Sequence, residues 1–504
     1  MGRHTQLERP AALEDLPASP AGPITAPATV AGAASRDAPL SWAETARVVL
    51  PAFVLTRVAV LVAGIAGAAL WGIHTDEVYD PAGLTTGLGA LTDRLVAPFA
   101  RWDAVWFLDI ANHGYPTSYL PRTAFFPLYP GLLRAGSVVG SPLLAGLLIS
   151  TVCAYGGAML LHRMTELELG RRAARASVWV LLVFPGSLWL TAVYSEGLFL
   201  LISVGCLYAA RERQWMVVAV LGALAATTRS AGIVLVVPIL VIAWQQQTGR
   251  SGPSPRALGV AALAGVVLLS LAAQLPWVVL LVPALAAAAY VLQRGPRTAD
   301  ADALERPRLL DPDRLRALSG PAAAAAMVAV GLLTFLVGLR LAGHTWTVSF
   351  DQQQEWGRRN VGPIDGVVRS GRSAVDGLEQ LFGPKVSPAI ITPNAEWMNP
   401  LLLVFLVLGL AALVGVARRL PPAYAAYAGC ALLLPLSAPV VSTGGEPLMS
   451  LPRFLGVLFP LAMWAGWWLT RGRWQRTRMV VLGVVGIGLL MLVTELTTRW
   501  VFVA

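Results

Sequence analysis

Charged side chains are scarce in this 504-residue chain. Asp, Glu, Lys and Arg together make up 13% of it, whereas soluble domains average about 25%. The residues AVILMFWYC make up 56%, and the mean hydropathy is +0.64. Uncharged runs such as 141–161 and 399–417 are each close to the ~20 residues that cross a bilayer as a helix. A soluble enzyme, a secreted disulfide scaffold and a disordered regulator are therefore excluded, and the sequence predicts a polytopic membrane protein.

Cysteine and lysine are also nearly absent. Cys153, Cys206 and Cys430 lie within apolar runs and are expected to be small buried hydrophobes, so neither a disulfide framework nor a zinc framework is available. Lys385 is the only lysine among 38 basic residues, and Arg carries the net charge of +10. In a membrane protein such charge sets the orientation of the spans. We therefore expect the lipid bilayer as a partner and no nucleic acid.

The apolar runs predict an all-α bundle of about thirteen transmembrane helices. The expected spans are 48–72, 141–162, 174–191, 194–210, 214–228, 230–245, 257–274, 276–292, 321–341, 399–417, 421–441, 453–470 and 479–498. The expected regions are a disordered cytoplasmic tail (1–45), an N-terminal transmembrane module (46–292), a cytoplasmic linker (293–320) and a C-terminal transmembrane region (321–504). The tail is rich in Ala, Pro, Thr and Gly and has no apolar core, so it is not a signal peptide.

Arginine clusters in alternate short loops fix the expected orientation. The positive-inside rule places these loops and the N-terminus in the cytoplasm, and it places two long polar segments, 73–140 and 342–398, on the outer face. Within the first of these, the apolar piece from Phe125 to Val139 is interrupted by Pro127, Pro130 and Arg134. Counting it as a span would reverse the arginine rule, so we expect a juxtamembrane helix there.

The densest group of reactive side chains is RWDAVWFLDIANHGYP at 101–116. On a helix Asp103 shares a face with Trp106 and Phe107, and aromatic rings of this kind lie at lipid headgroups. Partial desolvation there would make the carboxylate a better proton acceptor, which suits a general base; the alternative is a solvated Asp on an interfacial helix. Asp109, six residues further on, faces elsewhere.

Two neighbours of Asp103 also have two interpretations. Arg101 is expected either to contribute to substrate binding or to form at most a weak surface ion pair with Asp103. His113 either transfers a proton or hydrogen-bonds a sugar hydroxyl, or it is a helix-capping residue beside Gly114.

Three further charged residues interrupt apolar sequence near expected outer turns. An acid such as Glu196 is costly at membrane depth unless it is paired or functional, although it could also tie the turn through backbone amides. Arg229 could clamp a phosphate with parallel donors or reach towards the surface as a snorkelling side chain. Arg453, at the mouth of the span 453–470, could stabilise a leaving phosphate or anchor the helix at the interface.

The sequence lacks several catalytic motifs: it contains no HExxH, no Walker lysine, no GxSxG and no Cys/His ligand spacing. No metal site is predicted, although the scattered outer acids leave a divalent ion open. Matching broken spans in two halves, the pattern of many inverted-repeat transporters, are also absent from the sequence. The sequence therefore favours a transporter less than an enzyme.

These motifs, in this order, resemble a known family. The pieces are WDA, F, IA, HGY and AFFP over 102–127, then YSEGLF at 194–199, TRSAG at 228–232, and PRFLG at 452–456 followed by Pro460 and Trp464. The pattern is similar to the GPI mannosyltransferase II (PIG-V) family of the GT-C superfamily. The likeness covers the first outer segment and the following spans well, the end of the chain moderately, and 250–400 poorly.

The resemblance implies a GT-C-type helical bundle that uses a polyprenyl-phosphate sugar, usually mannose, as co-substrate. By matching position, Asp103 would be the catalytic base. Trp102, His113 and Tyr115 would line the same pocket. Glu196 would support the pocket, and Arg229 and Arg453 would face the donor phosphate.

Two departures from the family pattern concern the acceptor. Ala231 stands where the family often has Asn, and the segment 342–398, with FDQQQEWGRR at 350–359, does not look like that of eukaryotic members. With the Arg-rich composition, this predicts a bacterial, actinobacterial-type homologue in the plasma membrane. It would be a hexosyltransferase that transfers mannose to a lipid-linked or glycan acceptor. The alternative from another class is a lipid-linked sugar flippase.

Overall fold

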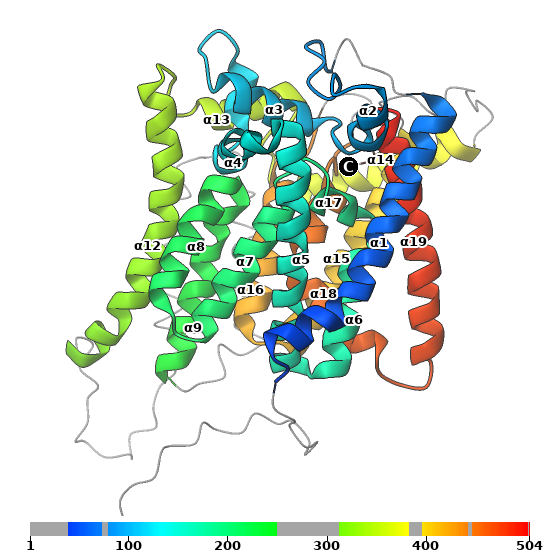
Figure 1. Ribbon diagram of the computed structural model, residues 1–504. Helices are drawn as coiled ribbons and strands as arrows, with labels where there is room; N and C mark the ends of the chain where they lie inside the picture. The colour runs from blue at the N-terminus through cyan, green and yellow to red at the C-terminus, as the bar shows by residue number, and fades with distance from the viewer. Residues whose placement is uncertain are drawn as a thin grey trace, which may run out of the picture. The chain divides into compact units, whose positions relative to one another are not determined.

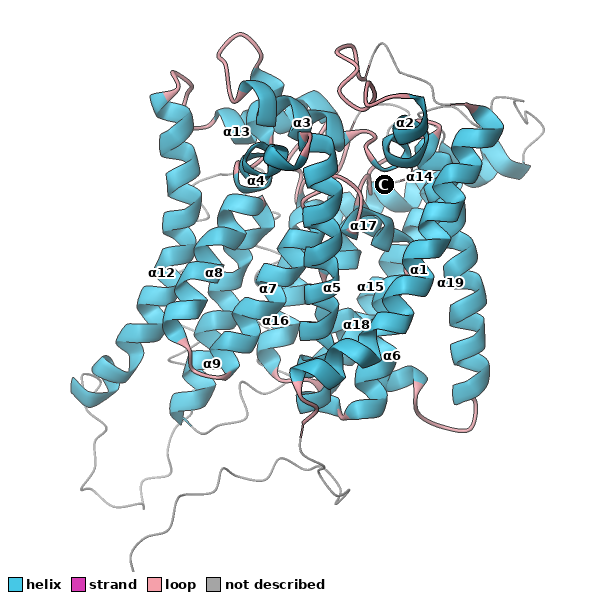
Figure 2. Ribbon diagram, viewed as in Figure 1, coloured by secondary structure: helices cyan, strands magenta, loops and turns pink. Residues whose placement is uncertain are grey.

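A computed structural model describes residues 39–72, 79–248, 312–382, 396–441, 446–501 and 503. Over these residues the protein is built from helices (Figure 2), and the extended pairing they contain is one isolated antiparallel bridge between Arg358 and Val440. The expected all-α class is confirmed. The tail 1–38, the expected spans 257–274 and 276–292, and residues 293–311 of the linker lie outside the described residues.

Within the described ranges, five helices are long and apolar enough to cross a membrane. They are α1 (Trp42–Trp71), α5 (Pro142–Leu169), α12 (Pro312–Leu341), α15 (Asn399–Arg419) and α19 (Gln475–Thr498). The shorter helices beside them are α6 (Arg171–Val183), α7 (Glu196–Arg211), α8 (Trp215–Thr228), α9 (Val236–Thr248), α16 (Pro422–Ser437), α17 (Leu451–Val457) and α18 (Phe459–Leu469). The expected number of thirteen spans is not confirmed.

Two expected spans are broken helices. The run 174–191 consists of α6 followed by the 3-10 helix η4 (Pro185–Leu190), and the run 453–470 is divided between α17 and α18 at Leu458. Pro185 and Pro460 each lack the amide hydrogen that a continuous helix needs at that point. Apolar length predicted both segments, but it did not predict where the backbone would bend.

The break between α6 and η4 exposes backbone carbonyls, and a partly buried arginine satisfies several of them. Arg57 of α1 donates to the carbonyls of Leu182 (3.2 Å) and Ser187 (2.7 Å), and to the hydroxyls of Ser187 (2.9 Å) and Thr191 (3.0 Å). Irregular backbone at membrane depth is tolerated where such partners exist. Arg57 therefore fixes the segment that leads into α7.

Short helices gather at one end of the bundle, the upper end in Figure 1. They are α2 (Ala90–Val96), η1 (Ala97–Phe99), α3 (Asp103–His113), η2 (Leu120–Ala124), α4 (Leu128–Gly136), η3 (Ser137–Val139), α13 (Val348–Asp351), η7 (Gln352–Trp356) and α14 (Pro363–Phe382). They belong to the two long polar segments of the sequence. The helix α4 has nine residues, or about 13 Å, so it cannot span a bilayer, in agreement with the expected juxtamembrane helix.

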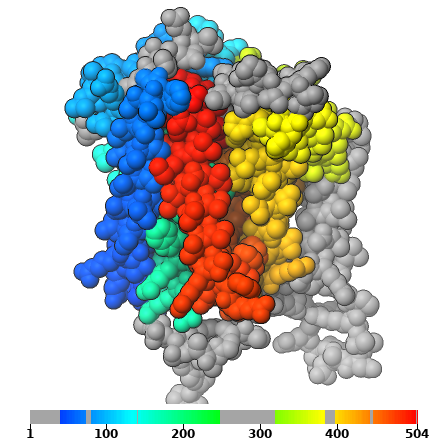
Figure 3. Space-filling model, turned by 90° about the vertical axis from the view of Figure 1, so that its right-hand side faces the viewer, coloured from blue at the N-terminus to red at the C-terminus, as the bar shows by residue number. Residues whose placement is uncertain are grey.

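The first and last spans pack against each other. Figures 1 and 3 show α1 and α19 side by side on one face of the bundle. Gly67 of α1 faces Thr498 of α19, where an added Cβ would lie 3.4 Å from the threonine side chain. The last described helix of the chain therefore packs directly against the first.

Candidate functional site

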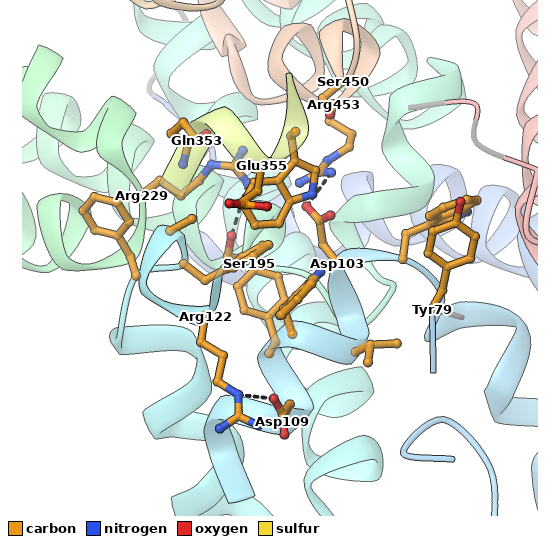
Figure 4. A pocket seen from close by; sticks show the side chains of 18 of the residues that line it. Tyr79, Asp103, Asp109, Arg122, Ser195, Arg229, Gln353, Glu355, Ser450 and Arg453 are labelled. Atoms are coloured by element: carbon orange, nitrogen blue, oxygen red, sulfur yellow. Dashed lines mark hydrogen bonds and ion pairs between the residues drawn. The ribbon is translucent and has the colours of Figure 1, made fainter. Parts of the chain in front are cut away.

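A cavity of about 700 Å³ opens at the upper end of the bundle. Its walls come from α3, the turn before α7, the junction of α8 with the 3-10 helix η5 (Ser230–Leu235), η7 and α17. Figure 4 shows Asp103, Arg229 and Arg453 among the side chains that line it. The three charged residues that the sequence suggested for one cleft therefore line one cavity, although they are far apart in the chain.

Buried ion pairs connect these residues through Glu196. Nη1 of Arg453 lies 2.7 Å from Oδ2 of Asp103, and its Nε donates to Oε1 of Glu196 at 2.9 Å. Nη1 of Arg229 lies 2.5 Å from the same Glu196 oxygen. Glu196 is fully buried and Arg453 is 5% exposed, so water screens these interactions little. The pairs form one chain of charges, Asp103–Arg453–Glu196–Arg229.

Asp103 keeps one carboxylate oxygen available to the cavity. Its Oδ2 is engaged by Arg453, whereas within the described residues its Oδ1 receives no hydrogen bond, and 20% of the side chain is exposed. Arg453 holds the carboxylate in a fixed position through this charge-assisted contact, as a positioned general base requires. Oδ1 is therefore the atom placed to accept a proton.

Helix ends position both acids of the site. Asp103 is the first residue of α3 and Glu196 is the first residue of α7, where the helix dipole favours negative charge. The residues directly before α3 and α17, Trp102 and Ser450, have φ values of 57° and 71°. Such left-handed conformations cost non-glycine residues about 1–3 kcal/mol. The fold thus accepts backbone strain at the two points from which Asp103 and Arg453 enter the cavity.

Two close contacts hold α17 and α3 in place. A Cβ atom at Gly186 would lie 2.2 Å from the carbonyl oxygen of Pro452, so only glycine allows η4 to approach α17 this closely. The hydroxyl of Tyr194 donates to the carbonyl of Arg101 (2.8 Å) and accepts from the backbone N–H of Asp103 (3.2 Å). The ring of Tyr194 also lies 4.8 Å from the Arg453 guanidinium. Tyr194 therefore contacts both the backbone at the start of α3 and the side chain of Arg453.

Some residues suggested by the sequence lie elsewhere. Trp102 lines the cavity, whereas His113 and Tyr115, which were also expected there, are not among the described residues that line it. His113 is ten residues along α3 from Asp103, about 15 Å away along the axis, and its Nδ1 contacts Asp109 at 2.8 Å. Tyr115 donates to the carbonyl of Phe125 (2.9 Å) and packs against Phe335. Arg101 is buried, not on the surface: it donates to Thr85 and lies over the ring of Trp500.

Other cavity residues were missed from the sequence. Asp109, expected to face elsewhere, lines the cavity in an ion pair with Arg122. Gln353, Glu355 and Arg358 also line the cavity, and Figure 4 shows the first two of them. The three glutamines, the two acids and the arginine pair within FDQQQEWGRR were the signal that could have identified these residues. Among the described residues, no group of three His, Cys, Asp or Glu side chains is placed to hold a metal ion.

Glu446 is buried near the site without a partner. It is 7% exposed, and within the described chain neither carboxylate oxygen has a hydrogen-bond partner. Burial raises the pKa of Glu446 from 4.5 to about 8. Between these two values the folded protein holds a proton that the unfolded chain has released, so the free energy of unfolding falls as the pH rises through this window.

We expect Glu446→Gln to remove this dependence, which amounts to about 1.4 kcal/mol per pH unit. Unfolding midpoints of the detergent-solubilised protein between pH 5 and pH 8 measure it, with Glu379→Gln on the exposed side of α14 as the control. Equal slopes for the wild type and the Glu446→Gln variant would contradict the prediction.

The described part of the chain is therefore an all-helical membrane bundle with a buried acid–arginine site at one end. Its resemblance to the PIG-V family is confirmed, because residues 47–248 match the family model described as Mannosyltransferase (PIG-V). This region contains Asp103, Glu196 and Arg229, while Arg453 and Arg358 lie outside it.

Several curated proteins are similar to part of the chain. It is 31% identical over 177 residues to the rat (Rattus norvegicus) protein named GPI alpha-1,6-mannosyltransferase 2, and 32% identical over 180 residues to the human (Homo sapiens) protein of that name. These alignments cover 32% of this chain and 35–36% of the relatives, so the chain spans about a third of the length of the curated relatives it matches.

Solved structures give a more distant likeness. Two structures of the oligosaccharyltransferase of Archaeoglobus fulgidus, one in the apo form and one tethered to an acceptor peptide, align with TM-scores of 0.39 and 0.37 at 12% identity. The alignments cover 88–89% of this chain and 55–56% of the other.

Proposed function

We propose that this protein is a membrane mannosyltransferase of GT-C type. It would transfer mannose from a polyprenyl-phosphate donor to a hydroxyl of a lipid-linked or glycan acceptor, with inversion at the anomeric carbon. The observation that carries the proposal is the Asp103–Arg453 pair in a cavity whose α3 and α7–α8 walls lie in the family-matching region 47–248. A base and a fixed positive charge in one enclosed site are what glycosyl transfer from a phosphate requires.

The proposed step has a defined atom balance. Oδ1 of Asp103 takes the proton of the acceptor hydroxyl, and the acceptor oxygen forms a bond to the anomeric carbon. The bond from that carbon to the phosphate oxygen breaks, and its electron pair leaves with the polyprenyl phosphate. Holding two amphiphiles in one membrane plane supplies much of the rate through orientation.

The proposed orientation places the cavity on the outer face. Arginines cluster where α5 meets α6, where α15 meets α16 and where α18 meets α19. These junctions lie at the opposite, lower end of the bundle in Figure 1. The positive-inside rule makes that end cytoplasmic. Donor and acceptor would then reach the cavity from the outer leaflet, at the plasma membrane if the protein is bacterial.

A transfer assay tests the proposal. The purified full chain in liposomes is given radiolabelled polyprenyl-phosphate mannose and a mixture of lipid acceptors. Label that moves into a new product supports a transferase. Label that crosses the liposome membrane without a new product would identify a flippase and overturn the proposal.

A further inference from the structure

The arginines of the cavity differ in whether a carboxylate neutralises them. Arg122 pairs with Asp109, Arg229 pairs with Glu196, and Arg453 pairs with both Asp103 and Glu196. Arg358 lines the same cavity, and within the described residues it has no carboxylate partner within ion-pair distance. Among the four arginines that line the cavity in the described structure, Arg358 is the one without a carboxylate in ion-pair contact.

Charge counting around Asp103 gives the same result. The two acids Asp103 and Glu196 balance the two arginines Arg229 and Arg453, so this group is neutral. Arg358 adds one positive charge nearby. Glu355 also lines the cavity, but within the described residues it makes no ion pair with Arg358. Burial, reinforced by the charge of Arg453, lowers the pKa of Arg358 to about 10, so it is protonated at neutral pH. A partly buried cation without a counter-ion is costly, and a bound anion would offset that cost.

The guanidinium of Arg358 is held in position with donors to spare. Nη1 donates to the carbonyl of Ala438 (3.1 Å) and Nη2 to the carbonyl of Met449 (2.8 Å). Arginine has five N–H donors, so three remain, including Nε. The backbone around it is fixed too, because Arg359 donates to the carbonyl of Pro439 (3.2 Å) and Val441 donates to the carbonyl of Gly357 (2.9 Å).

The ring of Phe454 is a common neighbour of Arg358 and Arg229. The guanidinium groups of Arg358 and Arg229 lie 5.8 Å and 5.7 Å from the centre of its ring. Phe454 follows Arg453 directly on α17, and all four side chains line the cavity. An anion bound to the free donors of Arg358 would thus lie beside the reacting centre.

We propose that Arg358 binds the phosphate of the lipid-linked donor, and that Arg229 and Arg453 chiefly hold Glu196 and Asp103 in place. This rests on the proposed function, because it assigns one part of that substrate to one residue. It also revises the expectation that Arg229 and Arg453 face the phosphate. Charge-assisted hydrogen bonds from a preorganised guanidinium suit a phosphate oxygen, and the bond strengthens as negative charge grows on the leaving group.

Binding measurements on the full chain test this without requiring transfer. The probes are a polyprenyl phosphate and the matching polyprenol, which lacks the phosphate. For Arg358→Gln we expect the Kd for the phosphate to rise about 10- to 100-fold and the Kd for the polyprenol to stay unchanged. Arg358→Lys should recover part of the affinity. Arg369→Gln on α14 is the matched control and should bind as the wild type does, because Arg369 is a partly exposed arginine, paired with Asp365, outside the cavity lining.

Several results would overturn the assignment. These are unchanged phosphate binding by Arg358→Gln, an equal loss for phosphate and polyprenol, or wild-type protein that binds the two probes alike. Where the wild type transfers mannose, Arg358→Gln should raise the donor KM with little change in the acceptor KM, and the reverse would refute the inference while leaving the function intact. Phosphate binding that depends on Arg358 in a protein that transfers nothing would refute the function and support the inference.

Discussion

Replacing Asp103 with asparagine is expected to lower mannose transfer by about 10²–10⁴-fold, the usual contribution of a general base. The amide has nearly the same shape as the carboxylate, but it does not accept the proton at the atom corresponding to Oδ1. The helix α3 should keep its place, because Tyr194 contacts the backbone of residue 103 and not its side chain. The measurement is the initial rate of transfer at saturating donor and acceptor.

Asp365→Asn is the control for this result. Asp365 lies on α14 with 41% of its side chain exposed, so its replacement changes one carboxylate outside the cavity. The unfolding midpoint of the Asp103→Asn protein should stay close to that of the wild type, since Arg453 keeps Glu196 as a partner. Transfer at the wild-type rate by Asp103→Asn would remove Asp103 from the mechanism.

Glu196→Gln is expected to have the largest effect on stability. One oxygen of Glu196 accepts from both Arg229 and Arg453, and the side chain is fully buried. Removing one partner from a buried ion pair typically costs about 3–5 kcal/mol, because the remaining charge is left without compensation. Here two arginines would lose their shared carboxylate. The protein should unfold at a lower temperature in detergent and should also lose activity.

A double-mutant cycle separates this network from a general loss of packing. Combining Glu196→Gln with Arg229→Gln should destabilise the protein by less than the sum of the two single changes, with a coupling of about 0.5–3 kcal/mol. Glu379→Gln on the exposed side of α14 should be neutral and should not couple to Arg229→Gln. Strict additivity for the Glu196–Arg229 pair would show that the ion pair contributes nothing to the folded state.

Apolar run length predicted most of the bundle, because a span must be long and uncharged whatever its partners are. The expected span 399–417 corresponds to α15, and the expected span 479–498 lies within α19. Run length could not predict the breaks after Val183 and Val457. Pro185 and Pro460 mark the positions where a helix can break, but whether the freed carbonyls find donors depends on tertiary contacts, such as those of Arg57 at the first break.

The site could be predicted only in part. Spacing along one helix placed Asp103 at a membrane interface, but no spacing rule connects it to Arg453, 350 residues later, so that connection came from the family resemblance. The same resemblance placed His113 and Tyr115 in the pocket. His113 is at the opposite end of α3 from Asp103, and Tyr115 lies just beyond that end, so neither lines the cavity. Arg358 was missed because what distinguishes it is the lack of an ion-pair partner. That can be recognised only once the positions of the neighbouring charged side chains are known.

Because the ribosome makes the chain from its N-terminus, the residues of the buried network are synthesised at different times. Glu196 and Arg453 are 257 positions apart, and at typical synthesis rates that separation is roughly 10–50 s of translation. During this interval the nascent protein has Asp103 and Glu196 with Arg229 but without Arg453. The docking of α17 against η4 at Gly186 is therefore a late assembly step, and a fragment ending at residue 248 would contain the acids of the site without the arginine that joins them.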